Sequence, residues 1–231
     1  TRAGADVAGA ARLLAQARER AVEAGDILTE LRCWYNIAAN RYYAGRVDEA
    51  LQVTEDGLDR ARATGLGWSA YGVAPRLCRD LVRYVLGDLT RTDTAGETMP
   101  EGSAPQLSCV QLYAAVARGD ADAVARGTAL RRDWFRDGQI ALISGGCSID
   151  ALTWAGRRDE AVALAVELVD EPGRTGSGYV LGRIWISALA LAALADAAAA
   201  ARLQGAAGAA TVRALVARGA ELRAAAAVSG A

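Results

Sequence analysis

Short turns that contain a glycine recur along the chain, and each follows a segment whose apolar residues have helical spacing. The glycines of four such turns, Gly45, Gly87, Gly119 and Gly156, lie 42, 32 and 37 residues apart. Intervals of this length are typical of proteins built from stacked antiparallel helix pairs, in which each repeat is one helical hairpin. The spacing therefore predicts an all-α protein, and specifically a right-handed α-solenoid of stacked hairpins.

The turn at 45–50, Gly-Arg-Val-Asp-Glu-Ala, returns almost unchanged at 156–161. A glycine can adopt the left-handed conformation that closes a helix. Asp48 and Glu49 then fall in the first turn of the next helix, where the helix dipole favours carboxylates. We therefore interpret this acidic pair as helix chemistry and not as a catalytic pair. In three other turns we expect the aspartate that follows directly to cap the next helix: Asp6, Asp88 and Asp120.

The composition favours helices, and it gives the chain almost no net charge. Apolar residues make up 52% of the 231 residues, and alanine, the best intrinsic helix former, is abundant. The formal net charge is −1, so no strong overall field attracts nucleic acid or an anionic membrane. The longest apolar run, 184–194, is too short to span a bilayer. We expect neither direct nucleic-acid binding nor a membrane segment.

The residue types that most often carry catalysis or metal binding are scarce. The chain has no histidine, which excludes Ser-His-Asp and Cys-His arrangements and histidine zinc sites. Cys33, Cys78, Cys109 and Cys147 lie 45, 31 and 38 residues apart, without a Cys-x-x-Cys pair. This spacing predicts reduced, mostly buried thiols and a cytoplasmic location. We expect no enzyme activity, no metal and no cofactor.

Three stretches have a chemical interpretation beside a structural one. Cys147 lies among the small residues of 144–150, which resemble a nucleophile turn, but we expect packing residues there. The glycine-rich stretch 173–182 follows an acidic helix and not a strand, so it is not expected to bind a dinucleotide. Asp133 and Asp137 lie one helical turn apart, and we expect them to form a solvated edge among neighbouring arginines.

One domain is expected over residues 1–231. Segment 90–105 is rich in threonine, glycine and proline, and it is predicted to be irregular. The alanine-rich C-terminal part, 180–227, is predicted to be helical with breaks at Gly205 and Gly208.

The segment 31–64 holds an aromatic residue, a large-then-small pair and a turn glycine in succession, at Trp34, Ile37–Ala38 and Gly45. In this order it resembles a tetratricopeptide repeat. In that motif an aromatic residue, a large-then-small pair, a turn glycine and further small residues stand at fixed positions. The resemblance implies that Ala38 and Ala50 let the two helices of the hairpin approach closely. The segment departs from the motif at Arg41, where an aromatic residue is expected, and at Gly57, where alanine is expected. The residues that carry the resemblance are Trp34, Ile37, Ala38, Tyr42, Gly45, Ala50 and Leu58.

The looser pattern of alanine- and arginine-rich repeats is similar to the sensor region of large actinobacterial LuxR-type, MalT-like ATP-binding transcriptional regulators. In that family a nucleotide-binding module precedes the repeats and a DNA-binding helix-turn-helix follows them. This chain shows neither motif, and without lysine it cannot contain a GxxxxGK[ST] loop. The resemblance implies a non-enzymatic sensor domain that binds a protein segment or a small-molecule effector. The alternative is a stand-alone tetratricopeptide adaptor or scaffold, and the oligomeric state is left open.

In stacked hairpins the first helices line the inner face, so aligning the turns gives a candidate groove. Grooves lined by aromatic and apolar residues bind helices, peptides or hydrophobic ligands. Core packing, or a helix of the C-terminal tail that fills the groove, is the structural alternative. The candidate residues are Arg32, Tyr35, Tyr42, Tyr43, Leu77, Leu81, Tyr84, Cys109, Tyr113, Ile143, Asp150, Trp154 and Trp185. Four other aromatic residues are expected to pack between helices: Trp34, Trp68, Trp134 and Phe135.

Overall fold

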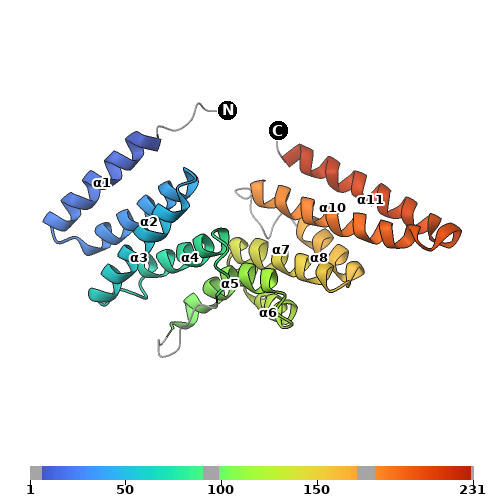
Figure 1. Cartoon of the computed structure of the whole chain (residues 1–231), viewed down its shortest axis with the longest axis horizontal. Helices are drawn as coiled ribbons and strands as arrows, with labels where there is room; N and C mark the ends of the chain where they lie inside the picture. Colours follow the sequence, from blue (N-terminus) through green and yellow to red (C-terminus); the bar gives the residue numbers. More distant parts are fainter. Residues whose placement is uncertain (1–6, 91–98, 171–179, 230–231) are drawn as a thin grey trace. The chain divides into compact units, whose positions relative to one another are not determined.

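The computed structural model describes residues 7–90, 99–170 and 180–229 of the chain. Helices and short connections make up this described part, which contains no β-strand (Figure 1). The prediction of an all-α protein is therefore confirmed. The contacts divide the chain into two compact units, Thr1–Ala114 and Ala115–Ala231. The prediction of a single domain stays a prediction, and each unit is described by itself.

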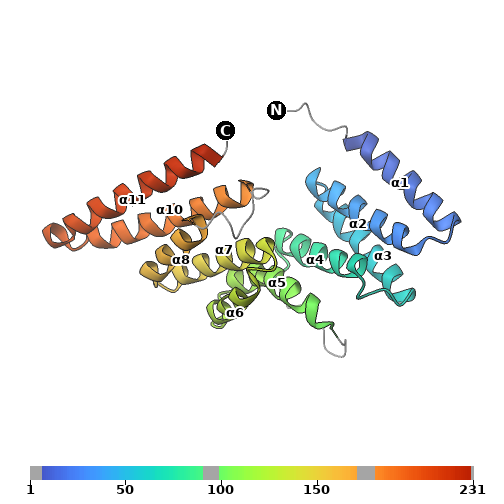
Figure 2. The ribbon, with the colours of Figure 1, turned by 180° about the vertical axis from the view of Figure 1, so that it is seen from behind.

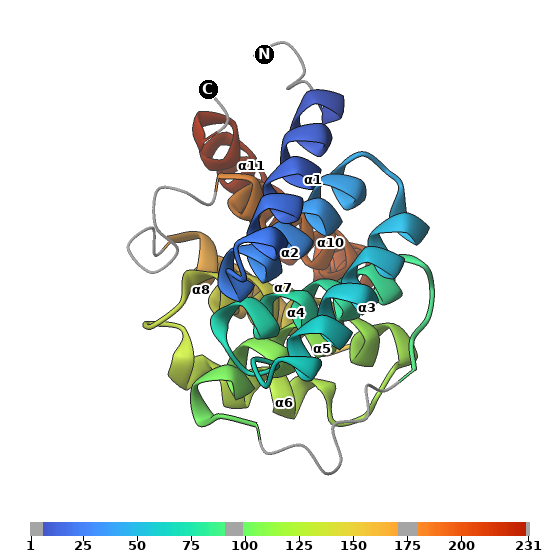
Figure 3. The same ribbon diagram turned by 90° about the vertical axis from the view of Figure 1, so that its left-hand side faces the viewer.

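The first unit consists of successive helices that turn back on one another. Neighbouring helices pack in sequence order, α1 on α2, α2 on α3 and α3 on α4. Figure 3 shows α2, α3 and α4 lying side by side. The helices of this unit are α1 (Val7–Glu23), α2 (Ile27–Tyr43), α3 (Val47–Ala63), α4 (Ala70–Val85), the short 3-10 helix η1 (Glu101–Ser103) and α5 (Ala104–Arg118), whose last residues belong to the second unit.

The second unit repeats this arrangement with longer helices at its end. The helix α7 packs on α6 and α8, and α10 packs on α8 and α11. Figure 2 shows α10 and α11 running side by side along their length. The elements of this unit are α6 (Ala123–Ala129), η2 (Leu130–Asp133), α7 (Gly138–Trp154), α8 (Arg158–Asp170), α10 (Val180–Arg202), η3 (Gly205–Gly208) and α11 (Ala209–Ser229).

Alternate helices also touch within each unit. In the first unit α2 contacts α4 as well as α3, and in the second unit α7 contacts α10 as well as α8. Each of these pairs joins the first helix of one hairpin to the first helix of the next.

Left-handed glycines end the helices, as the sequence predicts. Gly45 has φ +75°, its N–H donates to the Tyr42 carbonyl at 3.0 Å, and the N–H of Arg46 donates to the Arg41 carbonyl at 2.9 Å. This double bond pattern is the Schellman closure of a helix. The same pair of bonds closes a helix at Gly25, Gly65, Gly87, Gly119 and Gly156, all with positive φ.

Three first helices begin at a capping side chain that the sequence analysis did not identify. Asp26 accepts a hydrogen bond from the Thr29 amide at 3.0 Å, and Ser69 and Asp137 cap α4 and α7 in the same way. The expected caps behave differently. Asp88 accepts the amide hydrogen bond of Thr90 in a turn, at 3.1 Å.

The capping role expected for Asp120 is corrected. Its carboxylate pairs with the guanidinium of Arg118 at 2.7 Å and with that of Arg126 at 3.8 Å, and the residue before α6 is Asp122. Two nearby arginines therefore compete for the oxygens that a cap would use. The third expected cap, Asp6, lies outside the described residues.

Small residues set the close approach of α2 and α3. Ala38 and Ala50 are buried to 1% and 0% exposure, as the resemblance implies. A Cβ added at Gly57 would lie 3.0 Å from the Cβ of Trp34, which explains why glycine stands where the motif has alanine. A forked ion pair joins the same helices, because Arg60 donates to both oxygens of buried Glu30 at 2.8 and 2.9 Å.

Glycines within α7 explain the stretch that resembles a nucleophile turn. A Cβ added at Gly146 would lie 2.6 Å from a ring carbon of Trp185, and one added at Gly145 would meet the side chain of Leu168. Cys147, which follows these two glycines, is buried, and so is Ile149. The small residues of 144–150 therefore serve close packing of α7 against α8 and α10, as expected.

The segment 121–135 is not one continuous α-helix. The helix α6 ends at Ala129 and continues as a 3-10 turn to Asp133. Asp133 is buried, with Arg132 at 3.4 Å and Arg136 at 3.8 Å, so the expectation of a solvated acidic edge is corrected. The change of helix type also turns Phe135 outward to 74% exposure, and its expected packing role is wrong.

The expected packing role is confirmed for Trp134. Its side chain is buried, and its Nε1 donates a hydrogen bond of 2.8 Å to the hydroxyl of Ser144. Trp34 and Trp68 are half-buried, and each lies beneath an arginine guanidinium, Arg18 at 4.4 Å and Arg76 at 4.1 Å. In the segment 90–105, residues 91–98 lie outside the described residues, and α5 already begins at Ala104.

The helix α10 is longer than the apolar run on which the sequence analysis relied. The described residues contain one stretch that is long and apolar enough to cross a membrane by length and composition, Ile184–Arg202, with mean hydropathy 1.8. The expectation that the run 184–194 is too short is corrected to this extent. The same test is passed by core helices, and α10 packs against α7, α8 and α11.

Two glycine substitutions in helices distinguish close packing from helix propensity. Gly146→Ala is expected to lower the free energy of unfolding by about 1–3 kcal/mol, because the Trp185 ring must move. Gly219→Ala in α11 is the matched control, where the nearest atom lies at 3.5 Å and alanine is expected to add up to about 1 kcal/mol. Urea denaturation measures both, and a Gly146→Ala protein as stable as the control contradicts the packing described for α7.

Candidate ligand-binding surfaces

Two pairs of contacting tyrosines stand on three helices of the first unit, and together with Tyr35 we call them the tyrosine surface. Tyr42 and Tyr43 meet edge to face, with ring centroids 5.5 Å apart. Tyr84 on α4 stacks on Tyr113 of α5, with centroids 5.1 Å apart. Tyr43 is 85% exposed, and the others are half-buried. The members of the tyrosine surface are Tyr35, Tyr42, Tyr43, Tyr84 and Tyr113.

A cysteine that is not among the predicted groove residues lies next to two tyrosines of the tyrosine surface. Cys78 on α4 lies near Tyr35 and Tyr42 of α2, and its neighbourhood contributes to the raised pKa of both phenols. The hydroxyl of Thr54 on α3 lies 3.7 Å from the sulfur, which ties Cys78 to the third helix of the group. The signal for Cys78 in the sequence was weak, because an isolated cysteine on a helix is usually a packing residue.

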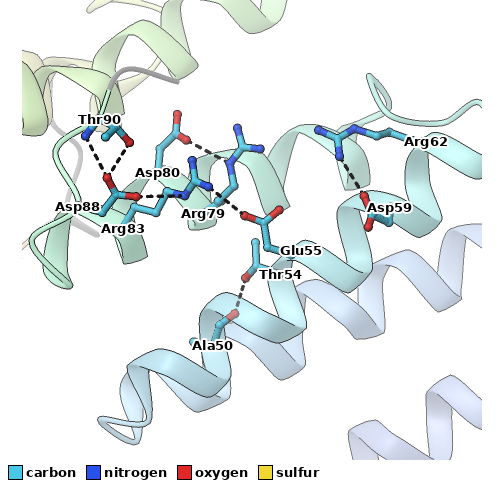
Figure 4. A network of polar contacts seen from close by, with 10 residues as sticks. All are labelled: Ala50, Thr54, Glu55, Asp59, Arg62, Arg79, Asp80, Arg83, Asp88 and Thr90. Carbon is cyan, nitrogen blue, oxygen red and sulfur yellow. Dashed lines mark hydrogen bonds and ion pairs between the residues drawn. The ribbon is translucent and has the colours of Figure 1, made fainter. Parts of the chain in front are cut away.

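Ion pairs fix the end of α4, where Tyr84 lies. Arg83 reaches Glu55 of α3 at 3.6 Å and Asp88 of the following turn at 3.7 Å. Asp88 in turn accepts hydrogen bonds from the amide and hydroxyl of Thr90 (Figure 4). These contacts fix the end of α4 to α3 and to the following turn, and the stack on Tyr113 is the contact that joins Tyr84 to α5.

A buried carboxylate joins α4 to α5 one turn before the stacked tyrosines. Asp80 is buried, and it accepts hydrogen bonds from Gln111 at 3.3 Å and from Arg79 at 3.4 Å. Figure 4 shows Arg79 and Asp80 together on α4. Gln111 lies two residues before Tyr113, so this contact sets the register of the two helices at the Tyr84–Tyr113 stack.

The tyrosine surface offers uncharged hydroxyl groups. Burial raises the pKa of Tyr35, with smaller contributions from Cys78 and Tyr43. Burial likewise raises the pKa of Tyr42, followed by the effects of Tyr43 and Cys78. A phenol with a raised pKa stays protonated at neutral pH. These residues can therefore donate and accept hydrogen bonds beside an aromatic face, without carrying charge.

The remaining candidates of the first unit surround the tyrosine surface with different exposures. Arg32 on α2 is exposed, and Leu77 and Leu81 on α4 are half-buried. Cys109 on α5 is buried to 1% exposure, so its side chain packs inside the unit and presents almost no surface to a partner. Cys109 and Tyr113 lie on the same side of α5, so this side is covered at Cys109 and partly open at Tyr113.

The second unit brings the other four candidates onto two contacting helices. Ile143, Asp150 and Trp154 lie on α7, and Trp185 lies on α10. Ile143 and Trp185 are half-buried, while Trp154 at the end of α7 is 82% exposed. We call Asp150, Trp154 and Trp185 the Trp–Asp site.

Asp150 is a half-buried carboxylate with an aromatic hydrogen-bond donor. Burial raises its pKa, and a hydrogen bond from the Trp154 side chain opposes this rise. Since indole can only donate, the carboxylate of Asp150 is the acceptor. No ion pair joins Asp150 to an arginine in the part of the chain that the structure describes.

The acidic pair that opens α3 carries the helix chemistry expected of it. Asp48 and Glu49 stand in the first turn of α3, and Glu49 pairs with Arg41 at 3.2 Å and with Arg46 at 3.8 Å. Among residues 7–90, 99–170 and 180–229, no group of three or more Cys, Asp or Glu side chains is placed to hold a metal ion. The glycine-rich stretch 173–182 lies mostly outside the described residues.

The raised pKa of Asp150 predicts a pH-dependent effect of its removal. A folded-state pKa above the unfolded value means that the ionised carboxylate lowers stability at neutral pH. This loss of stability disappears as the pH falls through the folded-state pKa to the ordinary carboxyl pKa of about 4. Asp150→Asn is therefore expected to raise the Tm by about 1–3 °C at pH 7, with no gain at pH 3.5.

Thermal unfolding followed by circular dichroism at several pH values measures this difference. Asp196→Asn on α10 is the matched control, because it removes the same charge from an exposed position. A Tm gain for Asp150→Asn that is equal at pH 7 and pH 3.5, or equal to that of the control, contradicts the assignment of desolvation to Asp150.

Comparisons with protein-family models, with curated proteins and with solved structures find no match to this chain.

Proposed function

We propose that this chain is a non-enzymatic helical-repeat domain that binds a protein segment or a small ligand on its first helices. The observation that carries the proposal is the tyrosine surface. Its rings come from α2, α4 and α5, contact one another in two pairs, and reach 85% exposure at Tyr43. Exposed and half-exposed aromatic groups on a fixed scaffold are typical of binding surfaces.

The chemistry of the tyrosine surface favours a partner with both apolar and hydrogen-bonding groups. Tyrosine supplies a large contact area at low conformational cost, together with a hydroxyl group. Two nearby arginines are already paired with carboxylates, since Arg41 contacts Glu49 and Arg83 contacts Glu55. A peptide in helical or extended form, or a small aromatic or apolar effector, fits these properties better than a highly charged ligand does.

The proposed architecture is a right-handed α-solenoid of the tetratricopeptide type. Support comes from the repeated left-handed glycine corners and from the contacts between alternate helices within each unit. In such an arrangement the first helices form the concave layer, and their side chains are the usual ligand contacts. The aromatic residues of α2, α4, α7 and α10 stand on helices of this kind.

The regulatory context of the proposal rests on the resemblance to LuxR-type, MalT-like regulators. In that context the domain is a cytoplasmic sensor, and a ligand that prefers one curvature of the repeats shifts the population of states of the attached modules. The alternative is a stand-alone adaptor that uses the same surface for protein–protein interaction. Reading the parent gene separates the two, because a phosphate-binding loop upstream and a helix-turn-helix downstream support the sensor.

Selection of peptides tests the proposed surface without knowledge of the natural ligand. A phage-displayed library of helical and extended 16-residue peptides is selected on the whole chain, and the affinities are measured by fluorescence anisotropy. The double variant Tyr42→Ala with Tyr84→Ala is expected to bind the selected peptides at least about tenfold more weakly, because two aromatic anchors are lost. Its far-UV circular dichroism is expected to be unchanged, since both side chains are only half-buried.

The matched control is Tyr71→Ala, which removes the same side chain from another face of α4. The control is expected to bind as the wild type does. Peptides that bind the double variant and the wild type equally well contradict the proposed surface. A library that yields no specific binder contradicts it as well.

A further inference from the structure

Three residues on one side of α7 and a tryptophan of α10 form a group in the second unit. Gly146, Asp150 and Trp154 are spaced four residues apart, so they follow one another along the same side of α7. The ring of Trp185 lies on Gly146, with a ring carbon 2.6 Å from the place of an added Cβ. A carboxylate therefore stands one helical turn from each of two tryptophans, Trp185 on one side and Trp154 on the other.

Charge complementarity identifies the kind of ligand that this arrangement favours. Asp150 is half-buried and hydrogen-bonded to Trp154, and the described arginines form no ion pair with it. A partly desolvated carboxylate without a counter-ion is stabilised by a cation placed beside it. The gain is largest where aromatic faces also surround the cation, because the negative face of indole attracts positive charge.

Three other tryptophans of the chain each have an arginine guanidinium over the ring. Arginine guanidiniums lie over Trp34 at 4.4 Å, Trp68 at 4.1 Å and Trp134 at 5.0 Å. Trp154 is 82% exposed, and no arginine of the described residues lies over it. Trp154 therefore has an uncovered ring face and a carboxylate, Asp150, beside it.

We propose that the Trp–Asp site, formed by Asp150, Trp154 and Trp185, binds an organic cation, either an ammonium or a guanidinium group. Asp150 supplies the counter-charge, and the two indole rings supply the aromatic walls. The cation is the head group of a small molecule or the side chain of a lysine or arginine in a protein segment. This inference specifies a ligand class for the second unit, and it rests on the proposed function as a binding domain.

Titrations followed by NMR of the indole N–H signals test the proposal on the whole chain. The probes are choline and its neutral isostere 3,3-dimethylbutan-1-ol, at constant ionic strength, and the signal of Trp154 is assigned with Trp154→Phe. Choline is expected to shift the Trp154 and Trp185 signals saturably and to bind at least about tenfold more tightly than the alcohol. Equal binding of the two probes, or no saturable shift with any cation, overturns the proposal.

Two carboxylate variants isolate the role of the counter-charge. Asp150→Asn keeps the shape and the hydrogen-bond acceptor, and it is expected to weaken choline binding by about tenfold. Asp196→Asn removes an exposed charge on α10 and is expected to bind choline as the wild type does. Wild-type affinity in the Asp150→Asn protein overturns the proposal.

A second arm separates the two sources of the cation. The tripeptides acetyl-Gly-Lys-Gly-amide and acetyl-Gly-Arg-Gly-amide are titrated beside choline. Saturation by choline supports a small-molecule head group, and saturation by the peptides alone supports a side chain presented by a protein. Loss of peptide binding in the tyrosine double variant, together with failure of every cation here, shows that only the ligand class is wrong, because the tyrosine surface belongs to the other unit.

Discussion

The left-handed glycine at each helix end is the constraint on which the rest of this structure depends. It stops a helix within one residue and lets the hydrogen-bond closure at Gly45 recur at other corners of the chain. Each corner sends the next helix back along its predecessor, so helices that follow one another in the chain pack together within each unit. Close packing then requires small residues, and Ala38, Ala50, Gly57 and Gly146 supply them.

The aromatic side chains divide into two classes by what covers them. Trp34, Trp68 and Trp134 are covered by arginines or buried against a partner helix, and they stabilise the fold. Tyr43 and Trp154 stand at the ends of first helices with more than four-fifths of their surface exposed. Polar contacts of Arg83 and Asp80 join α4 to α3 and α5, the helices next to the tyrosine pair Tyr84–Tyr113. Positioned but uncovered rings of this kind are what a binding surface requires.

Local signals in the sequence predicted local structure well, because glycine corners and the first-turn acids of α3 depend on the chain around them alone. Predictions that depend on which side of a helix a residue faces are less accurate. Cys109 is buried although it shares a side of α5 with half-buried Tyr113, and Phe135 is exposed where α6 has passed into a 3-10 turn. Asp120 was assigned as a cap, and ion pairs with Arg118 and Arg126 take its oxygens instead. Such contacts are decided by tertiary packing, which spacing does not record.

Hydroxyl-radical footprinting of the whole chain, read by mass spectrometry, tests most directly whether the aromatic ends of the first helices are open. The account predicts fast oxidation of Tyr43 and Trp154, and slow oxidation of Trp134, which is 3% exposed. Protection of Tyr43 and Trp154 to the level of Trp134 in the free protein would contradict it, because these rings would then belong to the packed interior.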